Sequence, residues 1–538
     1  MSPDETAPPA SKPMSVARAA GIISLATFLS RIMGLVREQV FAAQFGAGFA
    51  VDAFQVAFRV PNLLRDLFAE GAMSAAFVPT LTKAQQEGGP EAAMRLANLV
   101  INFLLVALSA LCLVGILTAP WIVGLLAPGF GEIPGKLALT TLMTQIMTPF
   151  LLLVSLAAAV MGVLNTRRVF FIPAVAPVLF NLGLIISGFA IAPFMPRVGL
   201  DPIVGMAFGA LLGGIGQLAI QLPALREQGF RWRPIISFRD PGVIRVVTLM
   251  APAAIGIAAA QVNVFTSTFL ASTLREGSVS WLNYAYRLMQ LPIGLFGVAI
   301  ATVTLAEVSR HAAAKNMTDL KATIGLSLRL VLFLTLPATL LLVVMAQPIV
   351  ALLYQHGRFS SADTVLTAHA LWAYAVGLSA FSAVRVMVPA FYSLNMARVP
   401  VTISMITIGV TVGLYFVLMG PLQHAGLALA TSIGSLLNFA MLFYALRQKV
   451  GALGARTLAT AALRILIASA LAAGAAWSAA TALGHGHELA SVPYRLLVVG
   501  AGFLAATLVY LAACTVLHVP EVKSVAETAG RIFARKRG

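Results

Sequence analysis

Residues 30–80 read SRIMGLVREQVFAAQFGAGFAVDAFQVAFRVPNLLRDLFAEGAMSAAFVPT and carry eight charged side chains within or beside two long apolar runs. Each run is long enough to cross a bilayer. The charged residues are Arg31, Arg37, Glu38, Asp52, Arg59, Arg65, Asp66 and Glu70. An ionisable group at that depth is costly unless it faces a partner or a water-filled cavity. We therefore predict that this stretch lines a hydrophilic cavity inside a membrane protein.

The composition predicts an all-α polytopic membrane protein. Of the 538 residues, 59% are apolar and 10% are charged, and the mean hydropathy is +0.92. A soluble globular protein carries about 25% charged residues. The net charge of +17 is therefore interpreted through its distribution across the membrane, and no nucleic-acid partner is expected. Cys112 and Cys514 lie in apolar runs, so we expect small buried side chains and neither a disulfide framework nor a metal site.

Fourteen runs are long enough to form spanning helices, for which about 20 apolar residues suffice. The runs are centred on residues 19–44, 51–80, 97–126, 137–163, 169–194, 202–223, 245–272, 279–308, 323–346, 364–394, 399–419, 424–446, 458–482 and 491–517. In the second run, Pro61 lacks a backbone donor, and we expect it to break the helix. The sequence FGAG (45–48) predicts the turn before it, because glycine adopts positive φ without strain.

The basic residues outside these runs favour one orientation. With the N-terminus in the cytoplasm, most of them fall in cytoplasmic connections, and the opposite loops hold only Lys136, Arg197, Arg275, Arg358 and Arg495. This asymmetry follows the positive-inside rule and places both termini in the cytoplasm. The predicted divisions are a disordered tail (1–16), a first lobe with helices 1–6 (17–226), a basic cytoplasmic linker (227–243), a second lobe with helices 7–12 (244–449), helices 13–14 (450–518) and a basic tail (519–538).

An internal repeat relates the two six-helix lobes. Ala57-Phe58-Arg59 matches Ala285-Tyr286-Arg287 at an offset of 228, and three other short matches follow in order at 221 to 230. A repeat unit of six spans gives both copies the same orientation. We therefore predict a pseudo-two-fold axis along the membrane normal, with a shared site between the lobes.

Arginine outnumbers acid inside the predicted spans. The arginines are Arg31, Arg37, Arg59, Arg65, Arg287 and Arg385, against Glu38, Asp52, Asp66 and Glu70. Arginine suits forked contacts with phosphate oxygens, so we expect the cavity to hold an anionic, phosphorylated headgroup. Asp52 is expected either to orient an arginine or to titrate during transport. The alternative is that these charges form structural ion pairs or snorkel to the interface, above all Arg59, Arg65, Asp66 and Arg385. The candidate substrate-binding residues are Arg31, Arg37, Arg287, Asp52, Arg65, Ser30 and Glu70.

Several segments resemble one family. They are SRIMGLVRE (30–38), FGAGFAVDAFQVAFRVPNLLRDLFAEGAMSAAFVP (45–79), APGF (127–130), LNTRRVFFIPAVAPVLFN (164–181), GSVSWLNYAYRLMQLPIGLFGVAIATVTLAEVSR (277–310) and PAFYSLNMARVP (389–400). They closely resemble the MurJ (MviN) family of lipid II flippases, within the multidrug/oligosaccharidyl-lipid/polysaccharide exporter superfamily. The resemblance extends from about residue 17 to the end of the fourteenth run.

The resemblance implies a V-shaped pair of lobes, alternating access and a groove for the polyprenyl tail formed by the two extra helices. It places the functional residues of the family on Arg31, Arg37, Asp52, Arg65 and Arg287. Where the family has a second basic residue after Arg65, this chain has Asp66, which puts a basic role at that position in doubt.

The implied function is to flip lipid II from the cytoplasmic to the periplasmic leaflet of the bacterial inner membrane, for peptidoglycan synthesis and cell shape. The resemblance thus implies a transporter and not an enzyme, with no cofactor, for which membrane potential or a monovalent cation could supply the driving force. Its partners would be lipid II, membrane lipids and proteins of cell-wall synthesis and division. Three alternatives stay open: a flippase for another polyprenyl-pyrophosphate-linked glycan, a multidrug/cation antiporter of the same superfamily, and a membrane scaffold. The antiporter would need an acidic cavity, and the scaffold would not need buried arginines.

Overall fold

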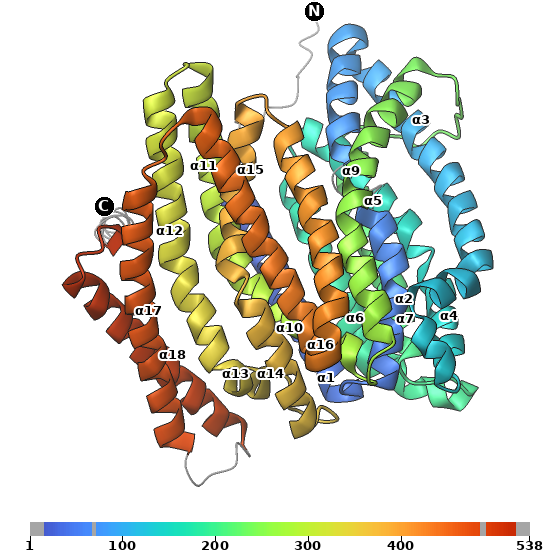
Figure 1. Cartoon of the computed structure of the whole chain (residues 1–538). Helices are drawn as coiled ribbons and strands as arrows, with labels where there is room; N and C mark the ends of the chain where they lie inside the picture. Colours follow the sequence, from blue (N-terminus) through green and yellow to red (C-terminus); the bar gives the residue numbers. More distant parts are fainter. Residues whose placement is uncertain (1–15, 67–71, 485–490, 523–538) are drawn as a thin grey trace, which may run out of the picture. The chain divides into compact units, whose positions relative to one another are not determined.

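The computed structural model describes residues 16–66, 72–484 and 491–522, and all regular structure in these ranges is helical (Figure 1). The first half contains α1 (Val16–Phe45), α2 (Phe49–Arg65), α3 (Ala72–Leu126), η2 (Pro128–Glu132), α4 (Lys136–Met147), α5 (Phe150–Thr166), α6 (Phe171–Ala190), η3 (Ala192–Val198), α7 (Val204–Ala219), α8 (Gln221–Glu227) and α9 (Pro241–Ser272). The second half contains α10 (Ser278–Pro292), η4 (Ile293–Gly297), α11 (Val298–Ala313), α12 (Met317–Val344), α13 (Ala346–Tyr354), α14 (Ser361–Ala375), α15 (Leu378–Ser393), α16 (Arg398–Val450), α17 (Ala455–Gly484) and α18 (Val492–Val516).

The all-helical membrane fold is confirmed, and the described part of each of the fourteen predicted runs lies mostly on helix. Helices α3 and α16 each cover more than one run. Each consists of two helical segments that join at a kink, which lies at Gly89 in α3 and at Gln423 in α16. Among the described residues, nine helices are long and apolar enough to cross a membrane, and the bent pair α14 and α15 makes a tenth. The count of fourteen spans therefore stays a prediction.

The connection between α1 and α2 confirms one local prediction and corrects another. Gly46 and Gly48 have φ of 71° and 132°, so the glycines of FGAG do form the turn. The prediction that Pro61 breaks the second run is wrong, because α2 continues through Pro61 to Arg65. Proline inside a spanning helix is tolerated where neighbouring groups satisfy the backbone carbonyl that loses its donor. The predicted N-terminal tail and most of the basic C-terminal tail lie outside the described residues.

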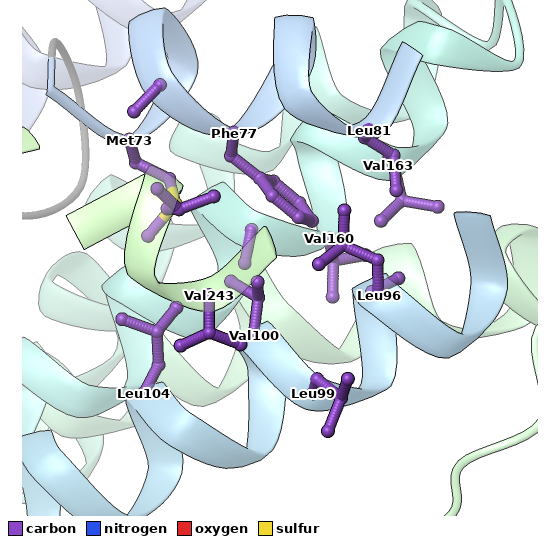
Figure 2. Packing of buried hydrophobic residues seen from close by; sticks show 14 of the residues in the cluster. Met73, Phe77, Leu81, Leu96, Leu99, Val100, Leu104, Val160, Val163 and Val243 are labelled. Carbon is purple, nitrogen blue, oxygen red and sulfur yellow. The ribbon is translucent and has the colours of Figure 1, made fainter. Parts of the chain in front are cut away.

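The chain forms two compact units. The first comprises residues 1–40, 57–122 and 138–260. Its core joins α3, α5 and the start of α9, where Phe77, Leu96, Val160 and Val243 pack together (Figure 2). Cys112 belongs to this core and is buried, as predicted.

The second unit comprises residues 41–56, 123–137 and 261–538. Its core is built by α12, α15 and α16, with Leu328, Val386 and Leu442 fully buried. Helices α17 and α18 pack on each other, and α17 packs on α12 (Figure 1). Cys514 on α18 is also buried, as predicted. The predicted lobe boundaries at 226 and 244 stay a prediction.

Helices α6 and α7 cross through glycines, and an alanine there is expected to destabilise the first unit. A Cβ added at Gly183 would lie 2.5 Å from the backbone nitrogen of Gly213. Overpacking of this kind costs about 1–3 kcal/mol because a backbone has to shift. We expect Gly183→Ala to lower the thermal unfolding midpoint of the purified protein in detergent. The control is Gly500→Ala, since a Cβ at Gly500 meets nothing within 4 Å. An unchanged midpoint for Gly183→Ala would show that the two helices do not cross this closely.

Candidate functional site

Arg37 on α1 is held in place by two side chains of the first unit. It forms an ion pair with Glu38, and its Nη1 donates a hydrogen bond of 3.0 Å to Oδ1 of Asn181 on α6. Arg37 is 9% exposed and Glu38 is 2% exposed. These contacts use part of the five-donor guanidinium and fix its plane, so the side chain is oriented in advance of any ligand.

Ser30 and Arg31 lie two turns before Arg37 on the same helix. Nδ2 of Asn181 donates a hydrogen bond of 3.2 Å to the carbonyl oxygen of Ser30, so Asn181 contacts both Ser30 and Arg37. This confirms that Ser30 and Arg37 share a helical face. Arg31 is exposed and lies six residues before Arg37, which is about 9 Å along the helix axis. Helix α1 therefore presents two arginines, of which one is fixed and one is exposed.

Arg65 at the end of α2 pairs with its neighbour. Its Nη2 and Nε donate to Oδ1 of Asp66 at 2.8 and 3.2 Å, and both side chains are 23% exposed. This local pair agrees with the structural alternative for these two residues. Glu70, another predicted site residue, lies outside the described residues.

Asp52 on α2 is 2% exposed and accepts four hydrogen bonds within the second unit. Oδ2 accepts from Nζ of Lys136 at 3.0 Å and from the backbone nitrogen of Gly277 at 2.8 Å. Oδ1 accepts from the backbone nitrogen and the hydroxyl of Ser280 at 2.8 and 2.6 Å. The expectation that Asp52 orients an arginine is wrong for the described residues, because a lysine and a helix N-terminus fill its acceptor positions. We call Asp52, Lys136, Gly277 and Ser280 the Asp52 cluster.

Lys136 is the residue that the sequence analysis missed. We predicted it in an outer loop, yet it is the first residue of α4 and is fully buried. Its ammonium lies 4.4 Å from the ring centroid of Phe130 and 5.7 Å from that of Phe49, so aromatic faces add to the carboxylate contact. A cation at a helix N-terminus opposes the helix dipole. The position of this lysine directly before an apolar run was therefore a signal that it needs an acidic partner.

The starts of α2 and α10 cap each other. Oε1 of Glu276, just before α10, accepts from the backbone nitrogen of Phe49 at 3.0 Å, while Asp52 accepts from the start of α10. Carboxylates are favourable at helix N-termini because they satisfy free N–H groups and the helix dipole. Asp52 and Ser280 are 228 residues apart, which equals the offset of the repeat match at Arg59 and Arg287. A two-fold relation brings equivalent positions into contact where they lie close to its axis.

Two further hydrogen bonds hold the same loops together. The hydroxyl of Tyr284 donates to the carbonyl oxygen of Gly46 at 3.0 Å. The backbone nitrogen of Arg358 donates to the carbonyl oxygen of Ala43 at 2.9 Å. Gly357 has φ of 57°, and a Cβ there would lie 2.1 Å from the carbonyl oxygen of Ala43. The Asp52 cluster thus lies where four loops, all predicted on the outer side, meet within one unit.

Arg287 is exposed on α10. It follows Ser280 and Tyr284 at helical spacings of seven and three, so the three residues share one stripe of the helix. Arg287 belongs to the second unit, whereas Arg31 and Arg37 belong to the first. The joint site of the three arginines therefore stays a prediction.

Comparison with known families finds one match over most of the chain. The family described as Lipid II flippase MurJ matches residues 41–496. The chain is 37% identical over 440 residues to a protein of Burkholderia cenocepacia named Lipid II flippase MurJ, covering 81% of this chain and 84% of that protein. It is 39% identical over 438 residues to a Rhizobium meliloti protein named Probable lipid II flippase MurJ, covering 80% of each.

Solved structures with the same fold are also found. One described as "Lipid II flippase MurJ, inward closed conformation" superposes with a TM-score of 0.76 at 26% identity, covering 93% of this chain and 99% of the other. A multidrug resistance MATE family transporter of the MOP superfamily, in an inward-facing conformation, superposes with a TM-score of 0.67 at 14% identity, covering 81% and 99%. The second likeness shows a shared fold alone.

Proposed function

Because the chain belongs to the lipid II flippase MurJ family, we propose that this transporter flips lipid II from the cytoplasmic to the outer leaflet of the bacterial inner membrane. The substrate assignment rests on the names of its relatives. The observation on this chain that supports it most is the fixed Arg37 beside the exposed Arg31 on one helix of a membrane protein. Buried arginine in a membrane segment is costly, and such residues pair with an acid or mark a substrate pathway.

In this proposal the arginines bind the pyrophosphate of lipid II. Arg31 and Arg37 of the first unit and Arg287 of the second would contribute forked contacts to its oxygens. Ligands from both units would make substrate binding favour one relative position of the units over another. That differential affinity is what a transport cycle requires. Arg65 and Glu70 remain candidate substrate-binding residues.

The Asp52 cluster supports alternating access. A carboxylate with four donors and a buried ammonium partner forms a closure at the predicted outer ends of α2, α4 and α10. We propose that this closure is intact while the substrate enters from the cytoplasmic side and separates when it leaves to the outer side. Membrane potential could bias the cycle, since one elementary charge moved across 100 mV is worth about 2.3 kcal/mol.

The arginine excess bears on the competing functions. A multidrug/cation antiporter would bind cationic drugs and would be opposed by exposed Arg31, Arg287 and Arg385. A flippase for another polyprenyl-pyrophosphate-linked glycan uses the same charge pattern and differs in the sugar that it accepts. The family match favours lipid II over that second candidate.

Depletion of this protein is expected to trap lipid II on the cytoplasmic leaflet. The measurement is the fraction of lipid II that is cleaved by an externally added enzyme acting on outer-leaflet lipid II, compared before and after depletion. We expect the accessible fraction to fall at least fivefold while total lipid II rises. The matched control is depletion complemented by Arg197→Ala, which changes an arginine outside the proposed site. An unchanged accessible fraction would favour a scaffold role over transport.

A further inference from the structure

A cavity of about 170 Å³ lies between α12, α17 and the residues that follow α18, all within the second unit. Its polar lining consists of Arg329, Thr457, Thr460 and Arg464, and Val519 and Pro520 close one side. Helices α12, α17 and α18 are neighbours within this unit (Figure 1). One water needs only about 10–15 Å³ of such space, so the cavity has room for a group of several heavy atoms.

The cavity carries an excess of positive charge. Nε of Arg329 donates to Oε1 of Glu521 at 2.8 Å, so this arginine has an acidic partner that is buried beside it. Nη1 of Arg464 donates to the carbonyl oxygen of His518 at 3.3 Å. In the three described ranges of the chain, no carboxylate pairs with Arg464. The Thr460 hydroxyl donates to the carbonyl oxygen of Thr457 at 3.0 Å. The Arg464 guanidinium and the Thr457 hydroxyl therefore supply the donors for an anionic ligand, and phosphate oxygens suit both.

The depth of the cavity points to a lipid as the source of the phosphate. Arg329 lies six residues into the predicted span 323–346, and Arg464 lies six residues into the predicted span 458–482. Both predicted spans begin on the cytoplasmic side, and six helical residues correspond to about 9 Å. An arginine at that depth reaches the headgroup region by snorkelling. Val519 and Pro520 follow the predicted cytoplasmic end of the last span. All three elements therefore place the cavity near the cytoplasmic surface of the membrane.

The surface next to Arg464 fits an acyl chain. Leu463, Ile467 and Leu471 follow one another at helical spacing on α17 and are 58%, 43% and 54% exposed. This apolar stripe begins beside Arg464 and runs away from the predicted cytoplasmic end. A headgroup in the cavity would therefore place its hydrocarbon chain along the stripe.

We propose that this cavity binds the phosphate of an anionic phospholipid of the cytoplasmic leaflet. The phosphate lies between the Arg464 guanidinium and the hydroxyl of Thr457, and the acyl chain follows Leu463, Ile467 and Leu471. The bound lipid bridges α17 and the residues that directly follow α18. This site is separate from the three arginines of the proposed transport site and does not depend on the transport proposal.

The test is native mass spectrometry of the full chain in detergent with added phosphatidylglycerol or phosphatidylcholine. We expect the wild type to retain phosphatidylglycerol in preference to phosphatidylcholine, and Arg464→Gln to lower the retained phosphatidylglycerol at least fivefold. The matched control is Arg456→Gln, an exposed arginine on the same helix that does not line the cavity. Equal retention by Arg464→Gln and wild type, or an equal loss in Arg456→Gln, would overturn the site.

Two further arms separate the possible sources and roles. Inorganic phosphate in millimolar excess should leave phosphatidylglycerol bound; its displacement would assign the cavity to free phosphate instead. Glu521→Gln removes the acid beside Arg329 and keeps an oxygen acceptor for its Nε. We expect this variant to retain at least twofold more phosphatidylglycerol, because a second arginine gains an unbalanced charge. Unchanged or reduced retention would contradict the electrostatic basis of the proposal.

Discussion

Arg37→Ala is expected to abolish growth of cells in which this chain is the sole lipid II flippase, while the protein still inserts into the membrane. The guanidinium is positioned by Glu38 and Asn181 and would bind pyrophosphate through its remaining donors. Each hydrogen bond to a charged group contributes about 1.5–3 kcal/mol. Loss of a forked contact should therefore lower the affinity for lipid II on the order of 100-fold or more. Growth complementation and lipid II binding to the purified variant are the measurements.

The same loss is expected for Arg31→Ala and for Arg287→Ala, the other two arginines of the proposed pyrophosphate site. Arg197→Ala serves as the control, since Arg197 stacks on Phe194 outside this site. If all three variants of the site supported growth as the only copy, the proposed pyrophosphate contacts would be wrong.

A second set of variants separates substrate binding by Arg37 from neutralisation of Glu38. Arg37→Ala alone leaves the buried Glu38 without this ion pair, which by itself destabilises a protein. Arg37→Ala combined with Glu38→Gln removes that unbalanced charge. If Arg37 serves only to neutralise Glu38, the double variant should restore growth. If Arg37 binds pyrophosphate, the double variant should recover its thermal stability and remain inactive. Arg37→Lys, which keeps the charge and loses the fork, should have intermediate affinity.

The sequence was sufficient to predict the fold class and the cationic stretch of α1. Hydropathy reports the free energy of moving a segment into lipid, which depends on that segment alone, so the described parts of the predicted runs lie mostly on helix. Helical spacing likewise depends on local geometry. It predicts Ser30 and Arg37 on one face of the helix, and in the structure Asn181 contacts both residues. Asn181 itself carries no such signal, because one amide in an apolar run has many alternative partners.

The Asp52 cluster could be predicted only in part, for a physical reason. Its contacts join segments separated by 84 and 228 residues, and hydropathy gives no information on which loops meet. The repeat offset did contain the relation between Asp52 and Ser280, since equivalent positions meet where they lie close to a two-fold axis. Lys136 has no repeat partner in the cluster, and a lysine in a short outer segment fits the charge asymmetry equally well. Its burial follows from packing around Phe130 and Asp52, which the sequence pattern does not encode.

Lys136→Met is expected to open the predicted outer end of the second unit. The Lys136 side chain is 1% exposed and that of Asp52 is 2% exposed, so removal of the lysine leaves a buried carboxylate with three donors and no counter-ion. Breaking a buried pair in this way costs about 3–5 kcal/mol. The cost falls on the closed arrangement, because Asp52 becomes hydrated once α2 and α10 separate. The equilibrium should therefore shift towards the open arrangement by a factor of 100 or more, since about 1.4 kcal/mol corresponds to tenfold.

The shift can be measured through Val279, which is 3% exposed and directly precedes Ser280 at the start of α10. Val279→Cys should react slowly with a membrane-impermeant maleimide in the otherwise wild-type chain and at least tenfold faster when combined with Lys136→Met. Background labelling should be low, because the native Cys112 and Cys514 are buried. Asp52→Asn combined with Lys136→Met removes both charges, and we expect it to return the labelling rate most of the way to the wild-type value. If Lys136→Met lowered thermal stability without faster labelling, the Asp52 cluster would stabilise the folded protein in general and would not control opening of the outer end. If Lys136→Met is labelled faster and the double variant is not, the buried charge pair itself holds the starts of α2 and α10 together.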